Sequence, residues 1–230
     1  MAVTVHRYNQ TAKLFLNKEI SLSTIKGMLL NSARTAAFDA THTSMEQALG
    51  GRKATVTITI ATPGVVTDTA HGYSNGQKVS PLTTGALPTG LATGIWYYVV
   101  NQTANTYQLS LTSGGSAINT TGTQSGVHTM YSDGVGQVSG NNWTDGGETF
   151  PTVVVAVRST SGAALTVGDV RKTATGADIG PAYGVLLYDS TTMNVLWLDD
   201  FGQAEQAGQE TDFLLVFDPT GTRGTVLTLT

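Results

Sequence analysis

Several short segments of the chain alternate polar and apolar residues with a period of two, and this alternation restricts the fold more than any other feature. Residues 55–60, TVTITI, alternate threonine with Val56, Ile58 and Ile60. Successive side chains of a strand point to opposite faces, so this segment is predicted to be a strand with one buried face. Residues 106–111, TYQLSL, follow the same pattern. Residues 95–100, IWYYVV, are apolar throughout, as in a strand that is covered on both faces.

Other segments that are rich in β-branched and aliphatic residues are also predicted as strands, with Gly, Asp or Asn between most of them. These are residues 13–16, 25–30, 152–157, 183–188, 194–198, 213–217 and 225–229. One short helix is expected at residues 44–49, SMEQAL, with Thr43 or Ser44 as its N-cap and two glycines after its end. Charged residues make up only 12% of the chain, and threonine can solvate the outer face of a strand without a charge partner. The sequence therefore predicts an all-β protein with very little helix.

The composition changes twice along the chain. Residues 54–131 are rich in Thr, Gly and Asn and carry little charge beyond Asp68 and Lys78, whereas acidic residues and larger aliphatics return on both sides. Such an island indicates an inserted module whose two ends lie close together. We therefore expect a discontinuous host domain, residues 1–53 and 132–230, that carries an inserted β module, residues 54–131.

Composition and charge also argue against several classes of function. The chain has no cysteine, which excludes disulfides and thiolate metal sites. Its net charge of −4 and its scattered Lys and Arg residues argue against a nucleic-acid partner. The N-terminus lacks the apolar run of a secretory signal, and no apolar run approaches the roughly 20 residues that span a bilayer. We expect a soluble protein that is made in the cytoplasm and has no membrane partner.

No arrangement of residues in the sequence is typical of an enzyme. The acidic residues between 199 and 212 lack an EF-hand pattern and are predicted to be solvated charge, with Glu205 and Glu210 in a loop between two strands. The histidines, His6, His42, His71 and His128, lack metal-ligand spacing, and His71 is expected in a turn, HGYSNG. A nucleophile elbow and a dinucleotide fingerprint are both missing. We therefore expect no catalytic residue, no metal and no cofactor.

Aromatic and amide residues gather in residues 93–111. Trp96, Tyr97, Tyr98 and Asn101 could bind a glycan, because ring faces stack on sugars and amides bond hydroxyl groups. The same residues suit a hairpin in which residues 95–100 and 106–111 pair across residues 101–105. In that hairpin Tyr98 or Trp96 would pack across the strands onto Tyr107, a contact worth about 0.2–1 kcal/mol. The hairpin is the favoured interpretation, and glycan binding is the alternative.

The first ten residues, MAVTVHRYNQ, mix Val3, Val5 and Tyr8 with polar residues. They could form a frayed terminus or an edge strand, or an arm that adds a strand to a neighbouring subunit. If they form such an arm, Val3, Val5 and Tyr8 are candidate contacts with a capsid or with another copy of the chain.

Three phrases inside the island resemble a known module. They are ATPGVVTDTAHGYSNGQKV at 61–79, TTGALPTGLATGIWYYVVNQTANTYQLS at 83–110 and GGSAINTTGTQSG at 114–126. Their wording and order resemble the small β-barrel-like module that recurs in structural proteins of tailed bacteriophages and prophages, typically as an addition to another domain.

The flanks resemble a phage virion protein of the β-sandwich-like type found on the capsid exterior or the tail. The matching phrases are ISLSTIKGMLLNSA at 20–33, TDGGETFPTVVVAV at 144–157, GPAYGVLLYDS at 180–190 and LWLDDFGQAEQAGQETDFLLVFDPTGTRGTVLTL at 196–229. The resemblance implies a β-sandwich-like host domain with an inserted β-barrel-like module.

The function that the resemblance implies is structural. We expect a non-enzymatic virion protein that binds the exterior of the assembled capsid and stabilises it as a decoration or cement protein. Its partners would be the major capsid protein and copies of itself, with a homotrimer favoured by the symmetry of such shells. A tail or fibre component that contacts host-surface glycans is the alternative. The chain has no long repeats of the kind usual in fibres, which favours the capsid surface over the tail.

Overall fold

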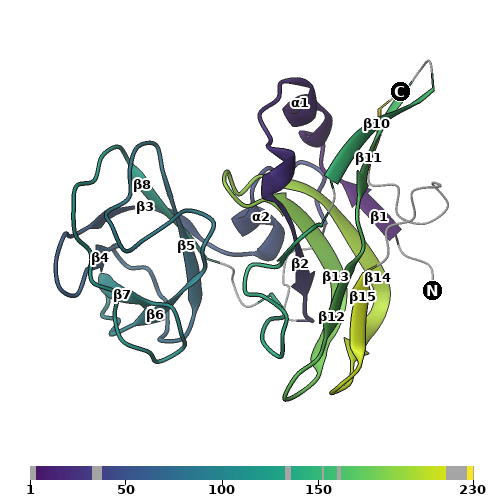
Figure 1. Cartoon of the computed structure of the whole chain (residues 1–230). Coiled ribbons are helices and arrows are strands. Elements are labelled where there is room, and N and C mark those ends of the chain that lie inside the picture. Colours follow the sequence, from purple (N-terminus) through teal and green to yellow (C-terminus); the bar gives the residue numbers. More distant parts are fainter. Residues whose placement is uncertain are drawn as a thin grey trace. The chain divides into compact units, whose positions relative to one another are not determined.

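The computed structural model describes residues 4–32, 38–132, 136–151, 153–159, 162–215 and 227–229. The chain divides into two compact units. One unit, called the host unit here, comprises Met1–Ser44 and Gly136–Thr230, and the other, the inserted unit, comprises Met45–Val135. Figure 1 shows strands as the main element of both units. The inserted unit starts before residue 54 because it includes the short helix α2 (Met45–Leu49).

The inserted unit is a closed barrel with the strand order β3-β4-β7-β6-β5-β8 (Figure 1). Its strands are β3 (Lys53–Ile58), β4 (Val66–Thr67), β5 (Lys78–Thr83), β6 (Tyr97–Val100), β7 (Thr106–Ser110) and β8 (His128–Ser132). The alternation of β3 has the predicted effect, since Val56 and Ile58 lie in the barrel core while Thr55 and Thr57 are exposed. The helix expected at residues 44–49 is present as α2, followed by Gly50 at φ +68°.

The hairpin of β6 and β7 is present, but its side-chain pairing differs from the prediction. Tyr98 lies opposite Ser110, and Val99 lies opposite Leu109. Tyr107 belongs to the barrel core and lies opposite Val66 of β4. The predicted packing of Tyr98 or Trp96 onto Tyr107 is therefore wrong. In this register Tyr97 and Val99 face the core, so Tyr98, the residue between them, points outward.

The host unit contains three sheets. The largest has the order β1-β14-β13-β2-β9, the second β10-β11-β16, and the third β12-β15. The strands of the largest sheet are β1 (Thr4–Arg7), β2 (Ile25–Leu30), β9 (Glu148–Thr149), β13 (Ile179–Asp189) and β14 (Val195–Ala207). The other strands are β10 (Val153–Ser159), β11 (Gly162–Val167), β12 (Val170–Thr173), β15 (Asp212–Leu215) and β16 (Leu227–Leu229).

One hydrophobic core joins these sheets. It contains Leu29 and Val185 from the largest sheet together with Val167, Val170 and Phe213 from the others. Sheets that bury their apolar faces against a common core form a sandwich-like arrangement. The predicted fold class, all-β with a β-sandwich-like host, a barrel-like module and very little helix, is confirmed.

Two local predictions in the host unit are wrong. Residues 13–16 are not a strand but part of helix α1 (Thr11–Leu16), in which Leu14 N donates to Gln10 O at 3.0 Å. Leu14 is buried whereas Leu16 is 71% exposed, so the side chains of the apolar run LFL point in different directions around the helix. A short 3-10 turn (Leu22–Thr24) follows before β2.

The second correction concerns the predicted loop at Glu205. Strand β14 continues through Ala207, and Glu205 pairs with Ala182 of β13. Only Glu210 lies in a turn, at φ +62°. Most side chains in the second half of β14 are exposed and polar. This half of the strand therefore has the composition of a loop, and the sequence predicted it as one.

Candidate functional site

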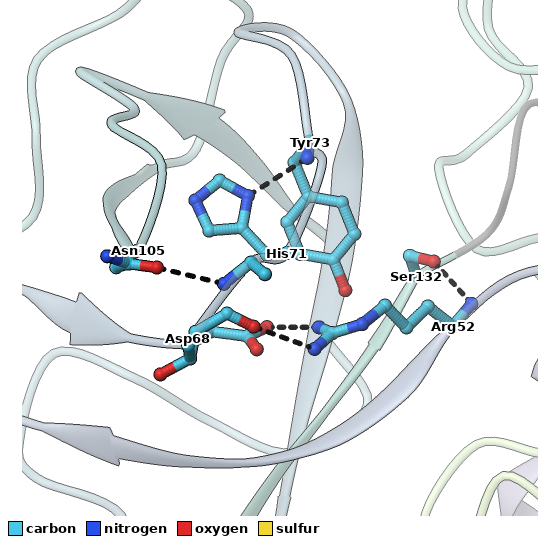
Figure 2. Close-up of polar contacts among 8 residues, drawn as sticks. Arg52, Asp68, His71, Tyr73, Asn105 and Ser132 are labelled. Carbon is cyan, nitrogen blue, oxygen red and sulfur yellow. Dashed lines mark hydrogen bonds and ion pairs between the residues drawn. The ribbon is translucent and has the colours of Figure 1, made fainter.

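A cluster of polar and aromatic side chains inside the inserted unit is its most distinctive site (Figure 2). Arg52 lies just before β3, Asp68 directly follows β4, and His71 and Tyr73 come from the loop after Asp68. Tyr107 projects from β7 into the same core. The cluster thus gathers residues from three separate parts of the barrel.

The centre of the cluster is an ion pair. Arg52 Nη1 lies 2.5 Å from Asp68 Oδ2, and the Asp68 side chain is only 2% exposed. The hydrogen bond to this carboxylate raises the pKa of the Arg52 guanidinium, which therefore remains charged. Arg52 Nη2 also reaches Thr69 O at 3.5 Å. A buried carboxylate needs such a partner, because desolvating it alone is costly.

The backbone of Arg52 closes the barrel at the ends of the inserted sequence. Arg52 N donates to Ser132 Oγ at 2.7 Å, and Ser132 N donates to Arg52 O at 2.8 Å. Figure 2 shows Ser132 beside the Arg52 backbone while the Arg52 side chain extends to Asp68. One residue therefore fixes the start of β3, the end of β8 and the loop after β4.

His71 is packed between two tyrosines. Its ring centroid lies 5.0 Å from those of both Tyr73 and Tyr107, and it is 5% exposed. Its Nδ1 accepts a hydrogen bond from Tyr73 N at 2.9 Å, so a neutral ring carries its proton on Nε2. The expected turn is present, but the positive φ angles belong to the neighbours Ala70 and Gly72.

The two tyrosines are poorly suited to proton transfer near neutral pH. Burial raises the pKa of the Tyr73 hydroxyl and, more strongly, that of Tyr107. The described residues offer no group of three His, Asp or Glu side chains that could hold a metal ion. The contacts of the cluster, an ion pair and tilted or edge-on ring contacts, hold the loop after β4 against the barrel, and this indicates a structural role.

The sequence did not single out this cluster, although one signal was present. Arg52 and Asp68 stand among very few charges in a Thr-rich stretch of the chain. Charges that fold into an apolar barrel are expected to pair with each other. The sequence alone did not indicate which of the neighbouring cations, Arg52 or Lys53, would reach Asp68.

The predicted N-terminal contacts lie partly inside the host unit. Val5 is part of β1 and lies opposite Asp199 of β14. Tyr8 is 3% exposed, and its N donates to Leu196 O at 3.2 Å. Val3 lies outside the described residues. The segment therefore forms an edge strand of its own sheet, and Tyr8 offers little surface to a partner.

The predicted glycan contacts separate into two pairs. Trp96 and Tyr97 are 4% and 2% exposed, so neither has a ring face open for stacking on a sugar. Tyr97 faces the barrel core, and its hydroxyl accepts from Ala92 N at 2.9 Å. Tyr98 is half-buried beneath Lys78, whose Nζ lies 5.4 Å from the ring centroid. Asn101 is exposed, so Tyr98 and Asn101 are the two predicted glycan contacts that remain accessible.

One member of the acidic group is not solvated as predicted. Asp199 is 5% exposed, and its Oδ1 has no hydrogen-bond partner among the described residues. Burial raises the pKa of this carboxyl to about 7. Glu210 and Asp212 are exposed, and Asp212 pairs with Arg171 at 2.9 Å. Apolar residues flank both aspartates in LWLDDF, so the local sequence did not indicate which of the two would be buried.

Comparison of the chain with protein-family models, with curated proteins and with solved structures finds no match. None of the helices in the described part of the chain has the length and apolar character needed to cross a membrane.

Proposed function

We propose that the chain is a non-enzymatic structural protein of a tailed-phage virion that binds the exterior of the assembled capsid and stabilises it. The observation that carries the proposal is that the sequence segments resembling phage proteins coincide with the two units of the structure. The phrases that resemble the phage module span residues 61–126, and these lie within the closed barrel of the inserted unit. The phrases that resemble a virion protein lie in the β-sandwich-like host unit.

The geometry of the inserted unit suits an addition to another domain. A closed barrel has no free strand edge that could pair with the host sheets. Its first and last strands are paired, with Lys53 opposite Tyr131, so the two ends of the barrel sequence lie side by side. The host unit can therefore carry the capsid contacts without support from the barrel strands.

The proposed mechanism is multivalent binding by a homo-oligomer, with a trimer favoured. Each copy bridges adjacent copies of the major capsid protein, so local opening of the shell must break several interfaces together. A protein built mainly of paired strands loses little conformational entropy when it binds. Binding free energy is then available to hold the shell closed.

The direct test compares phage particles with and without this protein. We expect particles that lack it to release DNA at a lower temperature and after milder osmotic shock. Adding the purified chain back should restore resistance. Equal resistance of complete and deficient particles would rule out the stabilising role.

A tail or fibre component that contacts host-surface glycans is the second candidate. The observation that favours it is the accessibility of Tyr98 and Asn101 on the β6–β7 hairpin. If it holds, Tyr98→Ala and Asn101→Ala phages should adsorb poorly while their capsids keep full heat resistance. Gln102→Ala, at an exposed residue of the same turn, is the matched control. Unchanged adsorption of both variants would remove this candidate.

A further inference from the structure

Asp199 is a buried acidic residue on β14, the strand next to the edge strand β1 in the largest host sheet. It lies opposite Val5 of β1 on one side and Val185 of β13 on the other. The residue is 5% exposed, and Oδ1 of its carboxylate has no hydrogen-bond partner among the described residues. An ionised carboxylate in such a place is unfavourable, because no cation or donor among the described residues replaces the water lost from Oδ1.

The two strands beside Asp199 differ greatly in how firmly they are held. Strand β13 is paired on both sides, with β14 and with β2. Strand β1 has four residues, and within the described part of the chain β14 is its only strand neighbour. Water can therefore reach the Asp199 carboxylate most easily by separation of β1 from β14.

We propose that Asp199 makes the docking of the N-terminal strand β1 dependent on pH. When the carboxyl is protonated, β1 stays paired with β14 and covers it. When the carboxyl is ionised, the paired state is weakened and β1 separates more often, which hydrates the charge.

The direction follows from the perturbed titration. Burial raises the pKa of Asp199 to about 7, above the ordinary value of 3.8. Ionisation is therefore disfavoured while β1 is docked and favoured once it separates, so separation increases as the pH rises. If separation restores the ordinary pKa, the population with β1 separated rises about tenfold between pH 6 and pH 8.

Other ionisable groups do not account for the perturbation, since burial is its cause. In the described part of the chain, four elements that pack against β14 carry ionisable side chains: His6 and Arg7 on β1, Lys13 on α1, Tyr183, Tyr188 and Asp189 on β13, and Asp212 on β15. Arg7 shares the Asp199 face two positions beyond Val5, and its side chain is exposed. His6 lies opposite Leu198 and so belongs to the other face of the sheet.

The separation is expected to stop at Tyr8. Tyr8 N is bonded to Leu196 O, and Thr11 Oγ1 donates to the same carbonyl at 2.5 Å. Gln10 Nε2 donates to Val195 O at 3.0 Å. These bonds keep the segment after β1 in place, so the separation ends at the last residue of β1, Arg7.

Hydrogen exchange of the full chain tests the proposal. Protection factors, which correct for the intrinsic effect of pH, would be measured for the amides of β1 and β2 at pH 6 and pH 8. In the wild type we expect β1 to be less protected than β2 at both pH values, because β1 opens without unfolding of the host unit, and we expect β1 protection to fall about tenfold as the pH rises.

The variants Asp199→Asn and Asp199→Leu both remove the ionisable group and should abolish the fall in β1 protection. Asp200→Asn, at the adjacent position on the other face, should behave like the wild type. The proposal is overturned if β1 loses no protection in the wild type, if both Asp199 variants keep the same fall, or if β1 is as strongly protected as β2 at pH 8.

Discussion

At the scale of single residues, the inserted unit depends on a buried charge with one partner. The Asp68 side chain is 2% exposed and that of Arg52 is 36% exposed, so the pair sits at the edge of the barrel interior. Removing one member of such a pair leaves the other charge buried and uncompensated. The effect of a substitution therefore depends strongly on which partner remains.

We predict that Arg52→Met lowers the free energy of unfolding of the inserted unit by about 3 kcal/mol. The double variant Arg52→Met/Asp68→Leu should recover much of this loss, because no charge is left buried. Lys53→Met is the matched control: Lys53 is exposed above the Tyr131 ring at 5.1 Å, and its loss should cost less than about 1 kcal/mol. Urea unfolding followed through the amide NMR signals of β7 measures all three. Equal effects of Arg52→Met and Lys53→Met would contradict the structural role of the ion pair.

The titration of Asp199 is expected to make the stability of the host unit depend on pH. Its folded-state pKa of about 7 is higher than the ordinary value of 3.8, so the unfolded chain gives up its proton first as the pH rises. Stability is therefore lost as the pH increases through about 7, and the loss from this group approaches about 4 kcal/mol at pH 8.

Asp199→Asn should remove most of this loss. We predict that the variant is more stable than the wild type at pH 8, by up to about 4 kcal/mol, and that the difference shrinks toward pH 5. Thermal unfolding across this pH range measures it. A variant that is less stable than the wild type at pH 8 would show that the ionised carboxylate is stabilised within the fold.

At the scale of elements, the close approach of β9 to β2 requires a glycine. Gly147 has φ +85°, and a Cβ there would lie 2.2 Å from Gly27 O and 2.8 Å from Met28 Cα. Gly140 has a similar φ of +89° but no atom within 4 Å of a Cβ. At both positions the positive φ would strain any residue that carries a side chain. The positions differ only in whether a Cβ would clash with neighbouring atoms.

Gly140→Ala should therefore cost about 1 kcal/mol of host-unit stability, through backbone strain alone. Gly147→Ala should cost a further 1–3 kcal/mol or so, because the main chain of β2 must shift. Denaturant unfolding of the two variants gives the difference directly. Similar costs at both positions would mean that β9 does not pack closely against β2.

The elements that the sequence predicted well have strong local patterns. Residues 25–30 are strand β2 with the same bounds, and the alternation of residues 55–58 matches the burial of β3. Strand β5 was missed because its sequence, KVSPLT, contains Pro81, which normally argues against a strand with neighbours on both sides. Helix α1 was predicted as a strand because a four-residue apolar run has no readable period.

The candidate site was harder to predict than the fold. Period two identifies which side chains of β7 face inward, but it does not reveal that Tyr107 meets His71 and Tyr73 from a distant loop. Likewise, nothing local distinguishes Asp199, which is buried, from Asp200, which is partly exposed. Contacts between segments far apart in sequence depend on register, and register is set by the whole sheet.

At the scale of the whole molecule, the chain combines two β units, one built as a closed barrel and the other around one hydrophobic core. The barrel closes on itself, and Arg52 and Ser132 bind each other where its sequence begins and ends. The host unit gathers its sheets around a single core. The proposed role on a virion rests on the agreement of these two units with the segments that resemble phage structural proteins.

The most direct test of that role is a cryo-electron microscopy comparison of wild-type phage particles with particles that lack the gene for this chain. The account predicts difference density on the outer surface of the capsid, repeated at symmetry-related positions and large enough for both β units. Identical capsid surfaces in the two reconstructions, or difference density confined to the tail, would contradict it.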